Sequence, residues 1–188
     1  KSVRAFEILP EDPDHWFLGT EGGLWESDDQ GKTWFRFEQF SREQIPFVRF
    51  LQNKLFLATA KELYFSEDLT QFKNVFSLNL IPNRSQIEAE DTAGEADFQE
   101  GTAEGTDFYH LISSSSKNSM LLWLASRKGI FESADGGLSW RALSTSGMRS
   151  SDCRHLIYSS KNRRLFAGTP KGVYAYQPGE ERWKELFE

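Results

Sequence analysis

The sequence predicts an all-β fold made of four copies of one unit, and three observations lead to this prediction. One short phrase occurs twice, since Ser27-Asp-Asp-Gln-Gly-Lys-Thr-Trp34 returns as Ser133-Ala-Asp-Gly-Gly-Leu-Ser-Trp140. Apolar residues form runs of about four to six that are separated by Gly, Pro, Asn and Asp, which is typical of strands. The chain of 188 residues is 38% apolar and 14% aromatic, which is ample for a core.

The phrase belongs to a larger unit that keeps its spacing in copies one and three. In copy one, Trp16-Phe-Leu-Gly-Thr20 precedes Gly23-Leu-Trp-Glu-Ser27 and Trp34. In copy three, Trp123-Leu-Ala-Ser126 precedes Gly129-Ile-Phe-Glu-Ser133 and Trp140 at the same offsets. Internal repetition of this kind identifies an architecture.

Two further copies are worn. Copy two, from Leu55-Phe-Leu-Ala-Thr59 to Phe72, keeps Ser66 and Asp68 but is one residue shorter. Copy four, from Leu165-Phe-Ala-Gly-Thr169 to Trp183, keeps the apolar frame and has lost the polar turn. All four copies are therefore expected to form the same strands.

The distances between the closing aromatic residues give the period. Trp34, Phe72, Trp140 and Trp183 are separated by 38, 68 and 43 residues, and the long step contains an insertion. A period of about 40 residues is the length of a propeller blade. We therefore expect one domain over residues 1–188, with four blades of four-stranded antiparallel meanders near 1–40, 41–78, 108–146 and 150–188. The first strands are expected at 3–9, 47–52, 108–113 and 154–159.

Each residue of the phrase has a structural role in a strand-to-strand turn. Ser27 and Asp29 are placed to share hydrogen bonds with nearby backbone amides, and Gly31 tolerates a positive φ. Trp34 is large enough to cover the turn and to pack between neighbouring sheets. The same roles are assigned to Ser66, Asp68, Ser133, Asp135, Gly137 and Trp140.

The pattern Ser-x-Asp-x-Gly-x-Thr/Ser-Trp resembles the Asp box, or bacterial neuraminidase repeat, of β-propellers such as sialidases, sortilin-type receptors and photosystem assembly factors. The resemblance implies a β-propeller or a portion of one, with the Asp box as a structural device, and an extracytoplasmic setting. Most closed propellers have more than four blades. We therefore expect an incomplete ring whose ends are covered by a second copy or another segment; a complete small ring is the alternative.

Charge is concentrated in the insertion at 80–107. Residues 87–107 hold eight acids and no base, so that the remainder of this chain of net charge −6 sums to +2. The composition predicts a mobile acidic insertion. A calcium-binding loop is the alternative, although the Asp-x-Asp-x-Asp-Gly spacing is absent. The single cysteine, Cys153, is expected to be buried.

No catalytic site, cofactor site or metal site is predicted. The resemblance to sialidases implies an arginine triad, a tyrosine nucleophile and an acid, yet the Arg-Ile-Pro signature of that family is missing. Ile45-Pro46 and Ile81-Pro82 occur without a preceding arginine. The three histidines, His15, His110 and His155, are too scattered for a metal motif. No apolar run is long enough to span a membrane as a helix.

The first strands carry the candidate binding residues. Arg4, Arg49 and Arg154 are interpreted as equivalent residues of copies one, two and four, and Tyr109 with His110 takes the corresponding place in copy three; His155 follows Arg154. In a propeller such positions line or rim the axial channel, where guanidinium groups favour an anionic partner. The alternative is that these arginines pair with Glu7 or Asp107 and only support the strands.

These observations together predict a non-catalytic scaffold that binds a protein partner through its axial or blade-top face. Photosystem assembly factors, which have a similar repeat, use an arginine-lined face to hold a protein, so the resemblance supports this interpretation. One alternative is a portion of a sialidase-like or other glycoside hydrolase propeller with catalytic residues outside this chain. Another is a module that assembles with a second copy of itself. Nucleic acid is not expected, because no basic stripe with interleaved aromatic residues is present.

Overall fold

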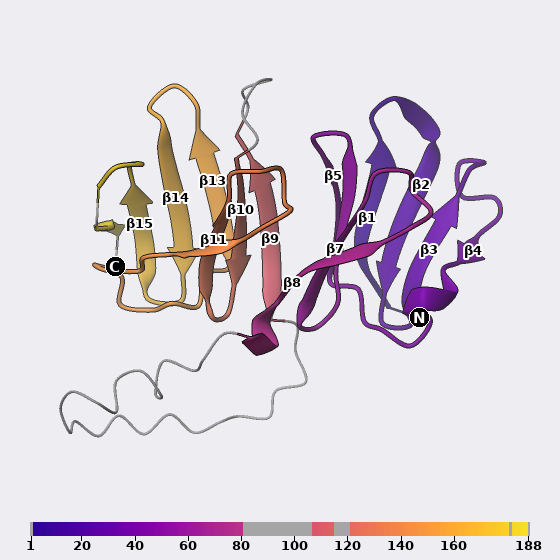
Figure 1. Cartoon of the computed structure of the whole chain (residues 1–188), viewed down its shortest axis with the longest axis horizontal. Helices are drawn as coiled ribbons and strands as arrows, with labels where there is room; N and C mark the ends of the chain where they lie inside the picture. The colour runs from indigo at the N-terminus through magenta and orange to yellow at the C-terminus, as the bar shows by residue number, and fades with distance from the viewer. Residues whose placement is uncertain (1, 81–106, 115–120, 181, 188) are drawn as a thin grey trace.

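The computed structural model describes residues 2–80, 107–114, 121–180 and 182–187. The chain forms four four-stranded antiparallel sheets, and in each sheet the strands follow one another in chain order (Figure 1). The predicted all-β fold of four-stranded meanders is confirmed. The predicted insertion at 80–107 lies almost entirely outside the described residues.

The strands have the following bounds. Sheet 1 contains β1 (Val3–Leu9), β2 (Asp12–Thr20), β3 (Gly23–Ser27) and β4 (Phe35–Arg36), and sheet 2 contains β5 (Phe47–Leu51), β6 (Lys54–Ala58), β7 (Glu62–Ser66) and β8 (Lys73–Ser77). Sheet 3 contains β9 (Phe108–Ser113), β10 (Leu122–Ser126), β11 (Gly129–Ser133) and β12 (Arg141–Leu143), and sheet 4 contains β13 (His155–Ser159), β14 (Arg164–Thr169), β15 (Gly172–Tyr176) and β16 (Lys184–Phe187). Two short 3-10 helices, η1 (Glu38–Phe40) and η2 (Leu78–Leu80), follow sheets 1 and 2.

Short turns explain why consecutive strands pair. Leu51 pairs with Lys54, so that only Gln52 and Asn53 connect β5 to β6. Both connecting residues have positive φ, 51° and 64°, as a type I′ hairpin requires. At the β2–β3 turn, Gly23 has a φ of 120°, which a residue with a Cβ rarely adopts.

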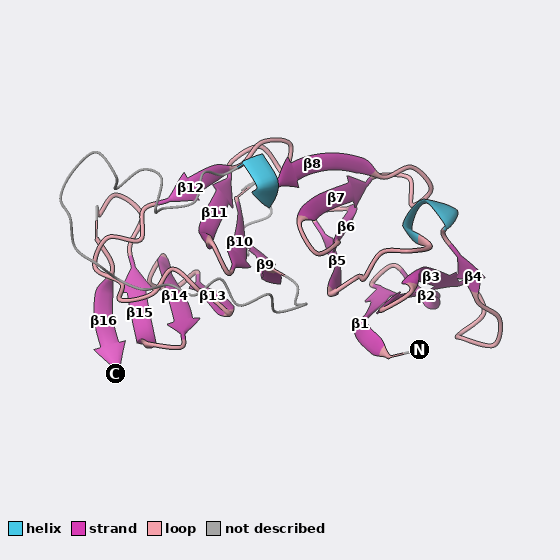
Figure 2. Cartoon of the chain, turned by 90° about the horizontal axis from the view of Figure 1, so that it is seen from below, coloured by secondary structure: helices cyan, strands magenta, loops and turns pink. Residues whose placement is uncertain are grey.

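The four sheets spread like an open fan. Figure 2 shows the first strands β1, β5, β9 and β13 along the inside of the fan and β4 and β16 at its opposite ends. First strands of consecutive sheets contact one another, whereas strands of sheets 1 and 4 form no extended contact in the described part of the chain. The described sheets therefore do not close into a ring.

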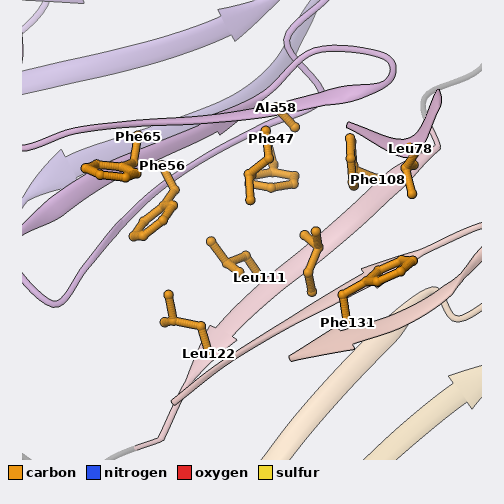
Figure 3. Close-up of a cluster of buried hydrophobic side chains, with 11 residues drawn as sticks. Phe47, Phe56, Ala58, Phe65, Leu78, Phe108, Leu111, Leu122 and Phe131 are labelled. Atoms are coloured by element: carbon orange, nitrogen blue, oxygen red, sulfur yellow. The ribbon is translucent and has the colours of Figure 1, made fainter. Parts of the chain in front are cut away.

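The core consists of three clusters of apolar side chains, one between each pair of neighbouring sheets. Figure 3 shows the cluster between sheets 2 and 3, in which Phe47, Phe56 and Phe65 face Leu111, Leu122 and Phe131. The cluster between sheets 1 and 2 contains Phe17, Leu24, Val48, Leu55, Leu57 and Phe72. The cluster between sheets 3 and 4 contains Trp123, Ile130, Leu156, Leu165, Tyr174 and Trp183, together with the buried Cys153.

Candidate binding face

The Asp box of copy one folds into a corner between β3 and β4 that satisfies its own polar groups. The Ser27 hydroxyl donates to Asp29 Oδ1 at 2.9 Å and accepts the Gly31 N–H at 2.8 Å. Asp29 also accepts the N–H of Thr33 at 2.8 Å and its hydroxyl at 2.6 Å. The Trp34 ring closes the corner by donating to the Gly31 carbonyl at 2.9 Å.

Copy three repeats this corner atom for atom. Ser133 donates to Asp135 at 2.8 Å and accepts the Gly137 N–H at 2.8 Å, and Asp135 accepts the N–H of Ser139 at 2.9 Å and its hydroxyl at 2.5 Å. Trp140 Nε1 donates to the Gly137 carbonyl at 3.1 Å. In both full copies, the carboxylate accepts its hydrogen bonds from residues of the turn in which it lies.

The worn copy two makes a tighter version of the turn. Ser66 donates to Asp68 Oδ1 at 3.0 Å, and the same oxygen accepts the N–H groups of Thr70 and Gln71 at 2.9 and 2.8 Å. Leu69 stands at a φ of 63°, where the full copies place a residue before glycine. The missing residue is thereby absorbed by a backbone conformation that leucine rarely adopts.

These hydrogen bonds hold the Asp-box carboxylates in the charged form. The hydrogen bonds from Thr33 lower the pKa of Asp29 from 3.8 to about 2. Burial would raise the pKa of Asp135, but the hydrogen bonds from Ser139 outweigh burial and the pKa falls to about 2. The backbone N–H groups of Gln71 and Thr70 lower the pKa of Asp68. Such groups are poor proton donors near neutral pH, and this fits a structural role.

At the opposite end of the sheets, the first strands bring Arg4, Tyr109 and Arg154 to one equivalent position. Ala5, which follows Arg4, pairs with Gly19, and His155, which follows Arg154, pairs with the equivalent Gly168. His110, which follows Tyr109, pairs with Ala125, the residue of β10 at the same position. The start of each first strand lies beside the turn between the second and third strands, so we call this end of the sheets the blade-top face.

The equivalence predicted for Arg49 is wrong. Arg49 pairs with Phe56 in the middle of β5, which is the position of Glu7 opposite Phe17 in sheet 1. Its Nη1 lies 3.6 Å from Glu7 Oε2, and Glu7 Oε1 accepts the N–H of Phe50 at 2.8 Å. Arg49 therefore links sheets 1 and 2, in line with the alternative that it supports the strands.

The two arginines of the blade-top face have acidic partners that leave donors free. Arg4 lies 2.5 Å from Glu21, and Arg154 lies 3.3 Å from Asp152. Both arginine side chains are about half exposed, at 46% and 57%. Exposed pairs of this kind contribute little free energy, and a guanidinium has five donors, so an anionic ligand can share or replace the partner.

His110 and His155 lie together between the first strands of sheets 3 and 4. Their ring centroids are 6.1 Å apart, and His110 Nδ1 accepts the N–H of Leu156 at 3.3 Å. Burial lowers the pKa of His110, and the positive charges of Arg49 and His155 lower it further. The pKa of Tyr109 is raised by burial and by the nearby Asp152. The histidine ring is thus a neutral acceptor that joins two sheets.

A row of lysines on the same face was not predicted. Lys61, Lys128 and Lys171 occupy the same position of the turn between the second and third strands in sheets 2, 3 and 4. Lys128 donates to the carbonyl of Leu78 at 3.0 Å. Lys61, Lys171 and the neighbouring Arg127 are exposed, and their side chains have no polar partner within the described ranges. Aligning the Gly-Thr pair of each copy with the following turn would have revealed this row.

Two kinds of feature are absent from the described part of the chain. No three histidine, cysteine or carboxylate side chains there come together as metal ligands would. None of the helices there is long and apolar enough to cross a membrane.

Comparisons with known proteins extend the fold assignment. No protein-family model matches the sequence, and no curated protein matches it. Among solved structures, an ancestral GH74 enzyme is 17% identical with a TM-score of 0.72, over 98% of this chain and 25% of the enzyme. YCF48 from Cyanidioschyzon merolae is 13% identical with a TM-score of 0.60, over 99% of this chain and 56% of YCF48. YCF48 bound to D1 peptide is 16% identical with a TM-score of 0.60, over 100% of this chain and 55% of YCF48.

The similar structures define the class to which the fold belongs. The four described sheets match blades of β-propellers, including GH74 enzymes and YCF48. The chain spans about a quarter of the GH74 enzyme and a little over half of YCF48. At these identities, the likeness concerns the arrangement of the sheets.

Proposed function

We propose that this chain is a non-catalytic binding scaffold whose blade-top face holds an anionic segment of a protein partner. The observation that carries the proposal is the gathering of cations at one end of three consecutive sheets. Lys61, Arg127 and Lys171 are exposed and have no polar partner among the described residues, and Arg154 shares its charge with Asp152. Guanidinium and ammonium groups placed in this way suit carboxylates. The YCF48 structure with a bound D1 peptide supports the proposal by analogy of fold.

The opposite end of the sheets is poorly suited to the same task. At that end, Asp29, Asp68 and Asp135 remain negatively charged, and their carboxylate oxygens accept hydrogen bonds from their own turns. A ligand at that end would have to displace hydrogen bonds that hold the corners. The Asp-box end also carries exposed cations, such as Lys32, Lys161 and Arg164, but it holds these three charged carboxylates as well. The proposal therefore assigns binding to the blade-top face. The extracytoplasmic setting implied by the Asp-box resemblance is part of the same proposal.

The test uses a fluorescein-labelled polyglutamate peptide as the anionic probe and fluorescence anisotropy as the readout. The binding variant is the triple substitution Lys61→Glu, Arg127→Glu and Lys171→Glu. Each reversal removes an exposed pair that is worth up to about 1 kcal/mol, so we expect binding to weaken by roughly tenfold or more at low salt.

The matched control makes the same change in net charge at the Asp-box end. Its substitutions are Lys32→Glu, Lys161→Glu and Arg164→Glu, at three exposed cations. The control is expected to bind the probe much as the unmodified chain does. Equal weakening by both triple variants would show that the probe senses only net charge, and this result would refute the proposal.

A second candidate function follows from the likeness to the GH74 enzyme, which has the TM-score of 0.72. In that case, this chain supplies blades to a glycoside hydrolase whose catalytic residues lie elsewhere. The solved GH74 structures of similar fold include a xyloglucanase from Xanthomonas campestris. Electrophoresis in gels with and without xyloglucan distinguishes the two functions, because blades that bind this polysaccharide are retarded by it, whereas the scaffold is expected to migrate equally in both gels.

A further inference from the structure

The three apolar clusters obey one rule about which face of a sheet meets which neighbour. In every sheet, one face holds the residues equivalent to Leu55 and Leu57, and we call it the leading face. In sheets 2, 3 and 4, these positions are buried against the preceding sheet. The other face, which we call the trailing face, holds the residues equivalent to Phe56 and Ala58. In sheets 1, 2 and 3, it is buried against the following sheet.

The leading face of sheet 1 carries the same kind of side chains without a cover. Phe6 is 47% exposed, whereas its equivalents Val48, Leu111 and Leu156 are each at most 2% exposed. Phe6 packs edge-to-face on Trp16 at 5.3 Å, and Ile8 beside them is 42% exposed. The face is thus built as an interface and remains open.

The Asp-box tryptophans obey the same rule. Trp140 and Trp183 pack against the clusters in front of sheets 3 and 4, as does the equivalent Phe72 in front of sheet 2. Trp34 belongs to none of the three clusters and lies against Gly31 within its own turn. No sheet of the described part of the chain lies in front of Trp34, so the predicted packing of this tryptophan between neighbouring sheets is not observed there.

The trailing face of sheet 4 is the complementary open surface. Ile157 is 65% exposed, whereas the equivalent Ile112 of sheet 3 packs into the cluster that contains Leu156. Val173 is 38% exposed, although its equivalents in the other sheets are buried. Phe187 pairs with Val173 and is 70% exposed. Soluble proteins rarely leave such a face open, and large exposed apolar patches mark interaction sites.

We propose that two copies of this chain pair, with the trailing face of sheet 4 in each copy packed on the leading face of sheet 1 in the other. The repeat supports a second copy as the occupant, because the two open faces are the halves of the interface that the chain already builds three times. Sheets 1 and 4 extend from the first strands in opposite directions (Figure 2), so that a two-fold rotation joins both ends at once. The product is a closed ring of eight sheets, and closure removes the open ends.

The same repeat gives the new interface specific contacts. Ile157 packs on Phe6 of the partner subunit, as Ile112 packs in the cluster that contains Leu156. His155, equivalent to His110, lies against the N–H of Phe6 of the partner subunit, as His110 Nδ1 accepts the Leu156 N–H at 3.3 Å. The pairing also places Arg154 of each copy beside Arg4 of the partner subunit on the blade-top face, so the ring continues the binding face across both copies.

Sedimentation equilibrium of the whole chain tests the proposal. The unmodified chain is expected to have twice its mass of 21.6 kDa at micromolar concentration. Phe6→Lys alone and Ile157→Glu alone each place a charge in both interfaces, and both variants are expected to be monomers. An equimolar mixture of the two regains the dimer, because one interface is then unaltered and the other brings opposite charges together. This recovery also shows that both variants are folded.

The control is Leu138→Lys, which changes an apolar side chain that is 58% exposed at an Asp-box corner away from both open faces. This variant is expected to remain a dimer. A monomeric unmodified chain, a dimer that survives either face variant, or masses that keep rising with concentration as in an open filament would each overturn the pairing.

Discussion

The Ser133 hydroxyl shows how one atom fixes a corner of the fold. It donates to Asp135 and accepts the buried N–H of Gly137, and its residue is only 1% exposed. Ser133→Ala removes the acceptor and leaves that N–H without a partner, which costs about 1–3 kcal/mol. Urea unfolding is expected to report this loss. The exposed Ser160→Ala serves as control and should change stability by less than about 0.5 kcal/mol; equal stability of the two variants would contradict the assigned role.

The Asp-box carboxylates also make stability depend on pH at the acid end. The folded pKa values of Asp29 and Asp135 are about 2, below the ordinary 3.8, so the folded state favours their charged forms. Their contribution is complete above about pH 4 and disappears as pH falls toward 2. We expect the urea midpoint of the unmodified chain to fall more between pH 5 and pH 2.5 than that of Asp29→Asn/Asp135→Asn. Parallel losses in the two proteins would show that other groups control the acid transition.

Sequence reasoning reached the corner residues and misplaced Arg49 for a physical reason. The Asp-box network is local, since every hydrogen bond of Asp29 is made within the phrase that ends at Trp34. The position of a first-strand residue depends on its pairing with the second strand. Arg49 is displaced from the position of Arg4 because of this pairing, and the spacing of arginines in the chain does not reveal it.

At the scale of elements, Gly137 joins a turn to the interface between two sheets. It has a φ of +92°, and a Cβ at this position would lie 2.6 Å from the Phe56 ring of sheet 2. Gly137→Ala therefore adds an overpacking cost of about 1–3 kcal/mol to a backbone cost of about 1–2 kcal/mol. Gly179→Ala is the matched control, because Gly179 has a φ of +97° and nothing lies within 4 Å of its Cβ position. Thermal unfolding should show the larger loss for Gly137→Ala, and equal losses would exclude the ring contact as a cause.

The strands themselves were predictable because pattern and turn chemistry agree in every copy. The expected first strands at 3–9 and 108–113 coincide with β1 and β9, and the other two differ by one residue at one end. Copy four shows how little of the phrase a blade needs. There, Tyr176 packs on Trp183 with ring centroids 5.1 Å apart in place of the serine and aspartate network. The apolar frame thus specifies the sheet, and the polar phrase specifies only the shape of its corner.

At the scale of the whole molecule, the fan is a linear stack in which each sheet depends on its neighbours alone. The sequence predicts four blades by its period, but the open ends appear only when exposure is compared between equivalent residues. Phe6 and Leu111 are both apolar in the sequence, yet only Leu111 has a preceding sheet to cover it. This comparison depends on tertiary packing, so the sequence alone does not provide it.

In a linear stack, a substitution that weakens one interface between sheets is expected to destabilise only the sheets near that interface. Phe17 and Trp123 occupy equivalent positions on the trailing faces of sheets 1 and 3, and both are almost fully buried. Substitution of either by alanine removes about 3–5 kcal/mol of packing. In the Phe6→Lys background, where the chain is expected to be a monomer, Phe17→Ala should speed hydrogen exchange in sheet 1 and leave sheet 4 protected. Trp123→Ala should do the reverse, because stability in stacked repeats is carried by nearest-neighbour interfaces. Exchange that rises equally in all four sheets with either substitution would show a single cooperative unit and contradict the stack.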